Sequence, residues 1–224
     1  VTQNQAHSYD VWEHLLRSLQ HAADKKWPLD IRLSALFHDI SKPATRHVSR
    51  DTNQVTFYGH EVKGSRETRK ILERLKFSRA TIDKVSKLVR WHMFFSDTEQ
   101  ISLSAVRRMI VNVGPENIWE LMNVRICDRL GTGRPKEDPY RLRKYHAMIE
   151  EALRDPVSVS QLKIDGKFMM GELGIKPGPR MGWILHALLE EVLDAPEKNT
   201  VEHLSELVKS LNMLGDAELR ALGE

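Results

Sequence analysis

Apolar side chains recur at intervals of three and four residues along most of this chain, and this helical spacing limits its fold more than any other feature. Ile82, Val85, Leu88 and Val89 illustrate it, because residues so spaced share one side of a helix. The spacing predicts helices over residues 11–19, 29–40, 59–75, 80–93, 102–113, 115–130 and 138–153. We therefore expect an all-α helical bundle.

Two places interrupt this pattern. Residues 45–49 and 55–57 are prone to form strands and flank the turn-rich segment 50–53, which predicts a small β-hairpin inserted between helices. Asp155-Pro156 marks a candidate domain boundary. Beyond it we expect a short helix near 166–173, a Pro/Gly turn at 176–179, a long helix to about 193, and terminal helices from Val201 and Asp216. The expected organisation is a domain over residues 1–155 and a C-terminal helical appendage over 156–224.

Composition indicates the cellular compartment in which the chain is expected. Its apolar stretch 184–189 is interrupted by His186 and is far too short to cross a membrane. The single cysteine, Cys127, excludes an intramolecular disulfide and fits a reducing compartment. The polar start of the chain has no signal-peptide pattern, so a cytoplasmic location is expected. The net charge of +3 is too small to indicate nucleic-acid binding by itself, although basic residues crowd the segment 125–144.

Two aspartates are predicted to lie where a helical bundle would bury them. Asp39, with His38, follows the apolar segment 33–37, and a buried carboxylate there is costly without a cation or hydrogen-bond donors. Asp128 follows Leu121 and Val124 at helical spacing, so it too points toward an apolar face. It could be a structural ion-pair partner of Arg125 or Arg129.

Histidines give these carboxylates a common explanation. His14 and His92 each lie on the apolar face of a helix, where a histidine alone is usually a hydrogen-bonded core residue. Together with His38 and the two aspartates, however, they would need five separate explanations, whereas one metal site accounts for all of them. Mixed nitrogen and oxygen ligands without thiolate suit Fe, Mn, Co, Ni, Zn or Mg rather than a structural zinc site built on cysteine.

The order His14, His38-Asp39, Asp128 resembles the H…HD…D signature of the HD superfamily of metal-dependent phosphohydrolases. His60 and His92 match the two extra histidines of its dinuclear members. The resemblance implies an HD-domain helical bundle with one or two divalent metals. It implies that His14, His38, Asp39 and Asp128 hold one metal, and that Asp39 bridges to a second metal held by His60 and His92.

Longer segments resemble a narrower group. The stretches YDVWEH (9–14), LFHDISKPATR (36–46) and FYGHE (57–61) are similar to the HD region of bacterial tRNA nucleotidyltransferases (CCA-adding enzymes) and poly(A) polymerases, and residues 173–182 and 196–199 are similar to their C-terminal segment. Nucleotidyl transfer in that family needs a Gly-Ser loop followed by paired carboxylates. Here Gly64-Ser65 falls inside a predicted helix and no Asp-x-Asp occurs. We expect a chain that does not add nucleotides by itself, as part of such an enzyme or as a stand-alone relative.

These features predict hydrolysis of a phosphate ester by metal-activated water, with Asp39 at its centre. Lys42 could reach a phosphate or offset charge at a helix C-terminus, and Arg129 is a similar candidate. Glu61 could orient water or a ligand, or face solvent. The resemblance implies 2′,3′-cyclic phosphodiester or phosphomonoester substrates, including nucleotides and the 3′ ends of tRNA or other RNA.

Two other classes of function stay open. Some dinuclear HD proteins are di-iron oxygenases, and the predicted ligands would also suit that chemistry. Alternatively the chain is a non-catalytic RNA-binding module, in which the segment 176–180 opens a helix whose N-terminus could bind an anion or could simply be a tight turn. The sequence leaves the metal, the natural substrate and the oligomeric state undetermined.

Overall fold

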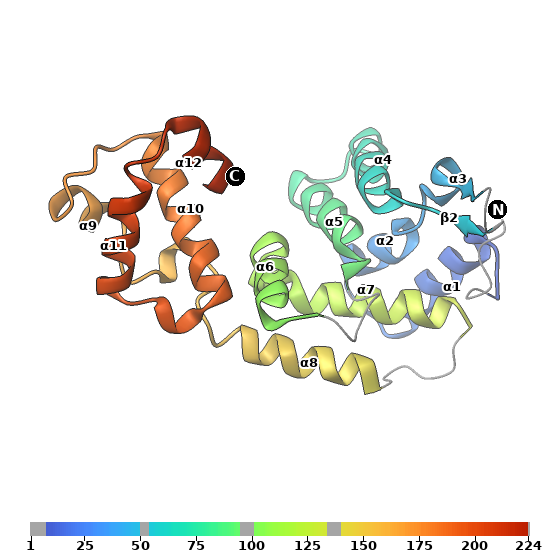
Figure 1. Cartoon of the computed structure of the whole chain (residues 1–224). Helices are drawn as coiled ribbons and strands as arrows, with labels where there is room; N and C mark the ends of the chain where they lie inside the picture. Colours follow the sequence, from blue (N-terminus) through green and yellow to red (C-terminus); the bar gives the residue numbers. More distant parts are fainter. Residues whose placement is uncertain (1–7, 50–53, 95–100, 134–139, 224) are drawn as a thin grey trace. The chain divides into compact units, whose positions relative to one another are not determined.

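The computed structural model describes residues 8–49, 54–94, 101–133 and 140–223. Within these ranges helices dominate and the one sheet is a two-stranded hairpin, so the predicted all-α fold with a small β-hairpin is confirmed (Figure 1). The hairpin pairs β1 (His47–Val48) with β2 (Val55–Thr56) in antiparallel register. The turn predicted at 50–53 lies outside the described residues. No helix in the described ranges has the length and apolar character needed to cross a membrane.

The contacts divide the chain into two compact units. The first comprises Val1–Glu99 and Glu116–Tyr145, and the second comprises Gln100–Pro115 and His146–Glu224. The helix α6 (Leu103–Val113) and most of α8 (Tyr140–Ala152) therefore belong with the C-terminal helices by contact. The domain boundary at residues 155/156 stays a prediction.

Among its described residues, the first unit is a bundle of five longer helices. They are α1 (Val11–Asp24), α2 (Leu29–Phe37), α4 (His60–Arg74), α5 (Arg79–Trp91) and α7 (Ile118–Gly131), with the single-turn helix α3 (Lys42–Thr45) between α2 and the hairpin. Asp10 caps α1 by accepting from the backbone of Glu13, and Ser78 caps α5 in the same way. One part of the core is the buried cluster Leu72, Ile82, Val85 and Val89, against which Leu33, Phe37 and Phe77 pack.

The helix predicted over 29–40 ends earlier, at Phe37. The next residues form turns, in which Ile40 N–H donates to Phe37 and Lys42 N–H donates to Asp39. Helical spacing did not reveal this end, because apolar Ile40 continues the pattern past it. His38 and Asp39 therefore lie in the turn that directly follows α2.

Helices α1 and α7 cross closely, and a glycine permits this approach. A Cβ added at Gly131 would overlap Ser18 Oγ and would lie 2.9 Å from the carbonyl oxygen of His14. Since His14 and Asp128 are carried by these two helices, the crossing sets the separation of two predicted ligands.

The second unit packs around α10 (Pro179–Asp194), which contacts α6, α11 (Val201–Leu211) and α12 (Asp216–Gly223). The short helix α9 (Gly166–Gly171) precedes it. Buried Arg107 donates to Asp155 and to the carbonyl of Leu193, at 2.8 Å each. Arg180, in the segment considered for anion binding, donates to the carbonyls of Asn212 and Leu214, also at 2.8 Å. This arginine therefore ties the start of α10 to the segment before α12.

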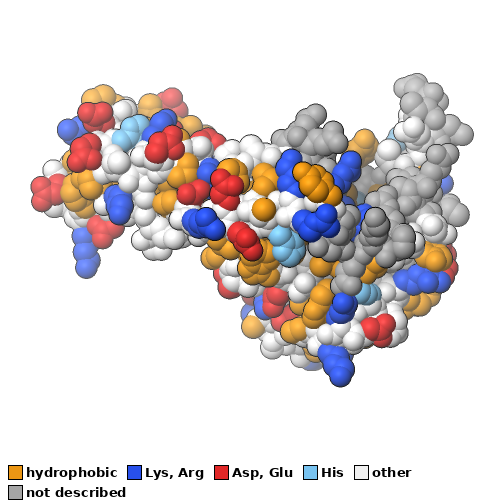
Figure 2. All heavy atoms as spheres, turned by 90° about the horizontal axis from the view of Figure 1, so that it is seen from below, with side chains coloured by type: hydrophobic (Ala, Val, Ile, Leu, Met, Phe, Trp, Pro, Cys, Tyr) orange, Lys and Arg blue, Asp and Glu red, His pale blue; other side chains and the backbone are white. Residues whose placement is uncertain are grey.

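Charged side chains of both signs are intermixed on the face drawn in Figure 2. This mixture agrees with the small net charge of +3.

Candidate metal centre

The six residues predicted to bind metal lie together in the first unit. His14 comes from α1, His38 and Asp39 from the turn after α2, His60 from the first turn of α4, His92 from the end of α5, and Asp128 from α7. They are all buried. Their donor atoms form two overlapping groups: His14, His38, Asp39 and Asp128, and Asp39, His60 and His92. Asp39 belongs to both groups.

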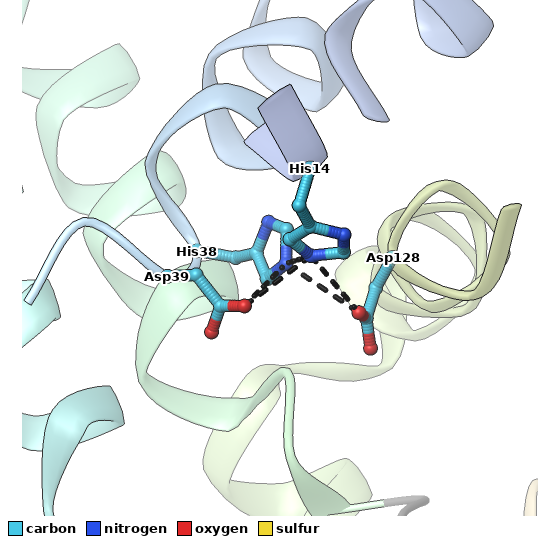
Figure 3. A group of neighbouring side chains, drawn as sticks. All are labelled: His14, His38, Asp39 and Asp128. Carbon is cyan, nitrogen blue, oxygen red and sulfur yellow. Dashed lines mark hydrogen bonds and ion pairs between the residues drawn. The ribbon is translucent and has the colours of Figure 1, made fainter. Parts of the chain in front are cut away.

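The first group converges on a single point (Figure 3). His14 Nε2 lies 3.2 Å from Asp39 Oδ2 and 3.3 Å from Asp128 Oδ1. His38 Nε2 lies 3.3 Å from Asp39 Oδ2 and 3.6 Å from Asp128 Oδ1. The two imidazole Nε2 atoms are themselves 2.9 Å apart. Two nitrogens and two carboxylate oxygens thus surround one small volume.

The second group uses the other oxygen of Asp39. His60 Nε2 lies 3.2 Å from Asp39 Oδ1, and His92 Nε2 lies 3.6 Å from the same atom. The Nε2 atoms of His60 and His92 are 3.3 Å apart. Asp39 therefore presents Oδ2 to one pair of imidazoles and Oδ1 to another, which is the arrangement that a carboxylate bridging two cations requires.

Backbone carbonyls orient three of the imidazole rings. His38 Nδ1 lies 2.9 Å from the carbonyl oxygen of the residue three positions before it, and the corresponding distance is 2.7 Å for both His60 and His92. Because a carbonyl oxygen can only accept, each Nδ1 must carry the proton and donate. In the neutral ring Nε2 then keeps its lone pair for a cation, which is the hydrogen-bond pattern typical of histidine ligands.

The carboxylate of Asp39 also fits a cation. Its side chain is buried, and within the described ranges neither oxygen accepts a hydrogen bond of good geometry, although Lys42 Nζ lies 2.6 Å from Oδ2 as an ion pair. A buried carboxylate in this state is costly unless a positive charge lies close to it. Imidazole and carboxylate donors without thiolate suit a divalent transition metal. The residues present therefore fit one or two such ions.

The electrostatics of the cluster follow from its opposite charges. Burial opposes the charged form of His38, but the negative charges of the adjacent Asp39 and of Asp128, 3.6 Å away, raise the pKa of His38 to about 10. The pKa of Asp39 lies well below its usual value, despite burial, because of the positive charge of His38 and the close approach of His14 Nε2, which lies 3.2 Å from Oδ2. Burial lowers the pKa of His92. A proton on His38 would thus compete with a metal for the same lone pair.

Arg125 holds the remaining oxygen of Asp128. Asp128 Oδ1 faces the two imidazoles, whereas Oδ2 accepts a hydrogen bond from Arg125 Nη1. Despite burial, Arg125 and His14 keep the pKa of Asp128 well below its usual value. The sequence offered Arg125 and Arg129 as alternative partners, and this geometry supports Arg125 in that role. The orienting carbonyls of Ala35, Phe57 and Val89 were not predicted at all.

The other predicted site residues lie at different distances from the cluster. Lys42 is buried and paired with Asp39. Glu61 Oε2 lies 3.8 Å from His60 Nδ1, and its other oxygen lies 3.8 Å from Arg90 Nη1. Arg129 follows Asp128 on α7 and is half-buried. The catalytic roles of Lys42, Glu61 and Arg129 stay predictions.

Comparison with known proteins places this geometry in context. The HD domain family matches residues 7–133. The chain is 33% identical over 194 residues to the CC-adding tRNA nucleotidyltransferase of Thermus thermophilus, covering 84% of the chain and 42% of that protein. It is 30% identical over 195 residues to the A-adding tRNA nucleotidyltransferase of Deinococcus radiodurans, covering 85% and 44%. A multifunctional CCA protein of Neisseria gonorrhoeae is 28% identical over 149 residues, covering 62% and 34%. The chain spans less than half the length of these curated relatives, and the matches agree with the resemblance drawn from its motifs.

Proposed function

We propose, since the chain belongs to the HD domain family, that it is a metal-dependent phosphohydrolase. The observation that carries the proposal is the position of Asp39, whose two oxygens face two separate pairs of imidazole nitrogens. In this role His14, His38, Asp39 and Asp128 hold one divalent metal, and Asp39, His60 and His92 hold a second.

The metals would lower the pKa of a coordinated water and neutralise charge that develops on the phosphoryl oxygens. The protein keeps the donors ready for this chemistry, because three Nδ1–H groups are fixed on carbonyl oxygens and Arg125 fixes Asp128. Lys42 lies against Asp39, so its ammonium group is placed to bind a phosphate oxygen. In the proposal Glu61 orients water beside His60, and Arg129 is a further cation near Asp128.

We propose phosphate groups at RNA 3′ ends as the substrate, either 2′,3′-cyclic phosphodiesters or phosphomonoesters. Two relatives are named as tRNA nucleotidyltransferases, and their similarity covers 84% and 85% of this chain. The similarity to these relatives is longer than the HD domain match over residues 7–133, so it continues beyond that domain. A phosphohydrolase with these relatives would meet its substrate at the end of an RNA strand.

Metal analysis joined to a substrate screen tests the proposal. The purified protein is analysed for bound metals and assayed with Mn²⁺, Co²⁺, Ni²⁺, Zn²⁺, Fe²⁺ or Mg²⁺ against 2′,3′-cyclic AMP, p-nitrophenyl phosphate and bis-p-nitrophenyl phosphate. Asp39→Asn should lower metal content and reduce hydrolysis by more than about a hundredfold. Asp24→Asn, at an exposed aspartate of α1, is the matched control and should behave as wild type.

Two outcomes would contradict the proposal. Wild-type protein that binds no metal and hydrolyses nothing faster than Asp39→Asn would remove the hydrolase assignment. Turnover that depends on both iron and dioxygen would assign the chain to the oxygenases instead.

A non-catalytic RNA-binding role is the second candidate, favoured by similarity to tRNA enzymes that extends into the second unit. If wild type hydrolyses no substrate with any metal, and Asp39→Asn binds RNA as tightly as wild type does, RNA binding without hydrolysis is the better account.

A further inference from the structure

A surface groove lies on the same helix that begins with His60. Its volume is about 670 Å³, and its lining comes mainly from α4, with Thr45 of α3 and Gly59 at one end. Gly59 directly precedes His60, so this end of the groove adjoins the candidate metal centre along the chain. The helix α4 therefore contributes both to the proposed phosphate-ester site and to an open groove.

Basic side chains line this groove. They are Lys63, Arg66, Arg69 and Lys70, and the one acidic residue among the lining residues is Glu67. Glu67 pairs with Lys70 at 3.0 Å, and Arg69 pairs with Asp83 at 2.7 Å. Within the described part of the chain, no carboxylate pairs with Lys63 or Arg66, and both are exposed. The groove thus holds more positive charge than its carboxylates balance.

The spacing of these cations forms a row along α4, the helix that begins with His60. Lys63, Arg66 and Lys70, which we call the α4 basic row, recur at three- and four-residue intervals and so share one side of the helix. With a rise of about 1.5 Å per residue, they lie about 4.5, 9 and 15 Å along the axis from His60. Steps of this size are comparable with the spacing of consecutive phosphates along an extended nucleic-acid strand.

An exposed aromatic ring lies beside the same end. Tyr58 precedes Gly59 and is 85% exposed. Proteins that bind single-stranded RNA commonly join a positive groove, which follows the phosphates, to aromatic rings on which bases stack. The α4 basic row and Tyr58 supply both elements.

We propose that the α4 basic row binds the backbone of a single-stranded RNA whose 3′-terminal phosphate enters the candidate metal centre. This proposal rests on the proposed function, because it extends the substrate from a terminal phosphate to the nucleotides before it. Lys63, Arg66 and Lys70 bind successive phosphates, and Tyr58 stacks on a base near the 3′ end. Because of the α4 basic row, the protein binds oligonucleotides more tightly than mononucleotides.

The test compares two triple variants of the full chain. K63Q/R66Q/K70Q removes the α4 basic row, and K163Q/K167Q/K209Q removes the same charge from exposed lysines of the second unit. Binding of a fluorescein-labelled 12-nucleotide RNA with a 2′,3′-cyclic phosphate end is measured by anisotropy at several salt concentrations. The row variant should bind at least about tenfold more weakly at 0.1 M salt, with a slope of log K against log salt reduced by about 2. The lysine control should match wild type.

A second pair of variants tests the aromatic contact. Tyr58→Ala should weaken binding of the same RNA by about fivefold or more, whereas Tyr58→Phe, which keeps the ring, should bind as wild type does. Thermal unfolding of every variant is recorded, so that a loss of binding can be separated from a loss of fold.

The results distinguish this proposal from the proposed function. Hydrolysis of bis-p-nitrophenyl phosphate, which is too small to extend along α4, is measured on the same preparations. In the row variant, the fold-loss of RNA affinity should be about ten times larger than any fold-change in the rate of this hydrolysis. If wild type shows no hydrolysis but the row variant loses RNA affinity, RNA binding by the α4 basic row is supported and the hydrolase proposal is rejected. Two results would contradict the binding of an RNA strand along α4. In the first, both triple variants bind RNA alike. In the second, the row variant loses 2′,3′-cyclic AMP binding as strongly as RNA binding.

Discussion

At the scale of single residues, the candidate metal centre depends on groups that hold its donors in place. Asp128 turns Oδ1 toward two imidazoles because Arg125 holds Oδ2. Three histidines point Nε2 inward because carbonyl oxygens hold Nδ1. Affinity for a metal should therefore respond to residues that do not touch it.

Arg125→Gln tests this dependence. The variant keeps a polar side chain but loses the charged hydrogen bond to Asp128 Oδ2, so this carboxylate should sample other orientations. We expect metal affinity to fall by about 10- to 100-fold, measured by competition with a chromogenic chelator. Arg79→Gln, at an exposed arginine paired with Asp83, is the control. An affinity of Arg125→Gln within twofold of wild type would show that Asp128 needs no such support.

The pH dependence of metal binding should reflect His38. Its pKa is raised to about 10, so the protein retains this proton at neutral pH and a metal must displace it. Raising the pH removes the competing proton. Affinity for Co²⁺ should therefore keep rising by up to about tenfold per pH unit from 7 to 8.5, where a ligand with an ordinary histidine pKa near 6.5 would already have levelled off. A chelator competition series that is flat over this range would contradict the raised pKa.

The sequence predicted the donors but not their supports. The donors could be found because His and Asp on apolar faces are costly and therefore conspicuous, as Asp39 is after the segment 33–37. The supporting carbonyls of Ala35, Phe57 and Val89 are backbone atoms, and any residue in those positions would supply them. They leave no signal in the sequence.

At the scale of helices, Gly131 sets how closely α1 and α7 approach. Gly131→Ala places a Cβ against Ser18 Oγ and 2.9 Å from the carbonyl oxygen of His14, so a helix backbone would have to move. Alanine is the better helix former by about 1 kcal/mol, but the clash should outweigh this gain. We expect a net loss of about 2 kcal/mol in the free energy of unfolding, measured by denaturant titration, together with weaker metal binding through displacement of His14.

A control and a rescue make this prediction specific. Gly171→Ala meets nothing within 4 Å, so it should leave stability unchanged or raise it slightly. Ser18→Ala combined with Gly131→Ala removes one of the two clashing groups and should restore part of the loss. If Gly131→Ala is as stable as wild type, the two helices can separate at little cost.

Element boundaries could be predicted only where local chemistry marks them. The hairpin was expected over 45–49 and 55–57, and the structure keeps its centre as β1 and β2, with Thr45 ending α3 instead. The end of the helix that begins at Leu29 was expected at Ile40, three residues after its observed end at Phe37, because apolar spacing extends through Ile40 while the turn bonds that stop α2 involve backbone atoms.

At the scale of the whole molecule, the metal donors and the C-terminal helices belong to different units. All six donors lie in the first unit. A ligand stabilises the part of a protein to which it binds, by mass action. Calorimetry should therefore resolve two unfolding transitions, of which metal raises one and a chelator lowers it. Two transitions that move together by the same amount would show that the units unfold as one.

The grouping of helices by contact is a different feature from the domain boundary predicted at Asp155-Pro156, which stays a prediction. The contacts assign α6 to the second unit, and Arg107 of α6 reaches Asp155 and Leu193, 48 and 86 residues away. Pairings at such separations leave no periodic trace in the sequence, whereas the helices themselves do.

The carboxylate of Asp39, shared by both donor groups, makes the two positions interdependent. An ion that enters the first group would orient Oδ2, and this would align Oδ1 for the second group, but its charge would also repel the next ion. These two opposite effects cannot cancel at every ionic strength. The first and the second metal ion should therefore bind with different affinities, in two separate steps. The protein would then exist as three species, empty, singly loaded and doubly loaded, and the supply of metal would decide which of them is present.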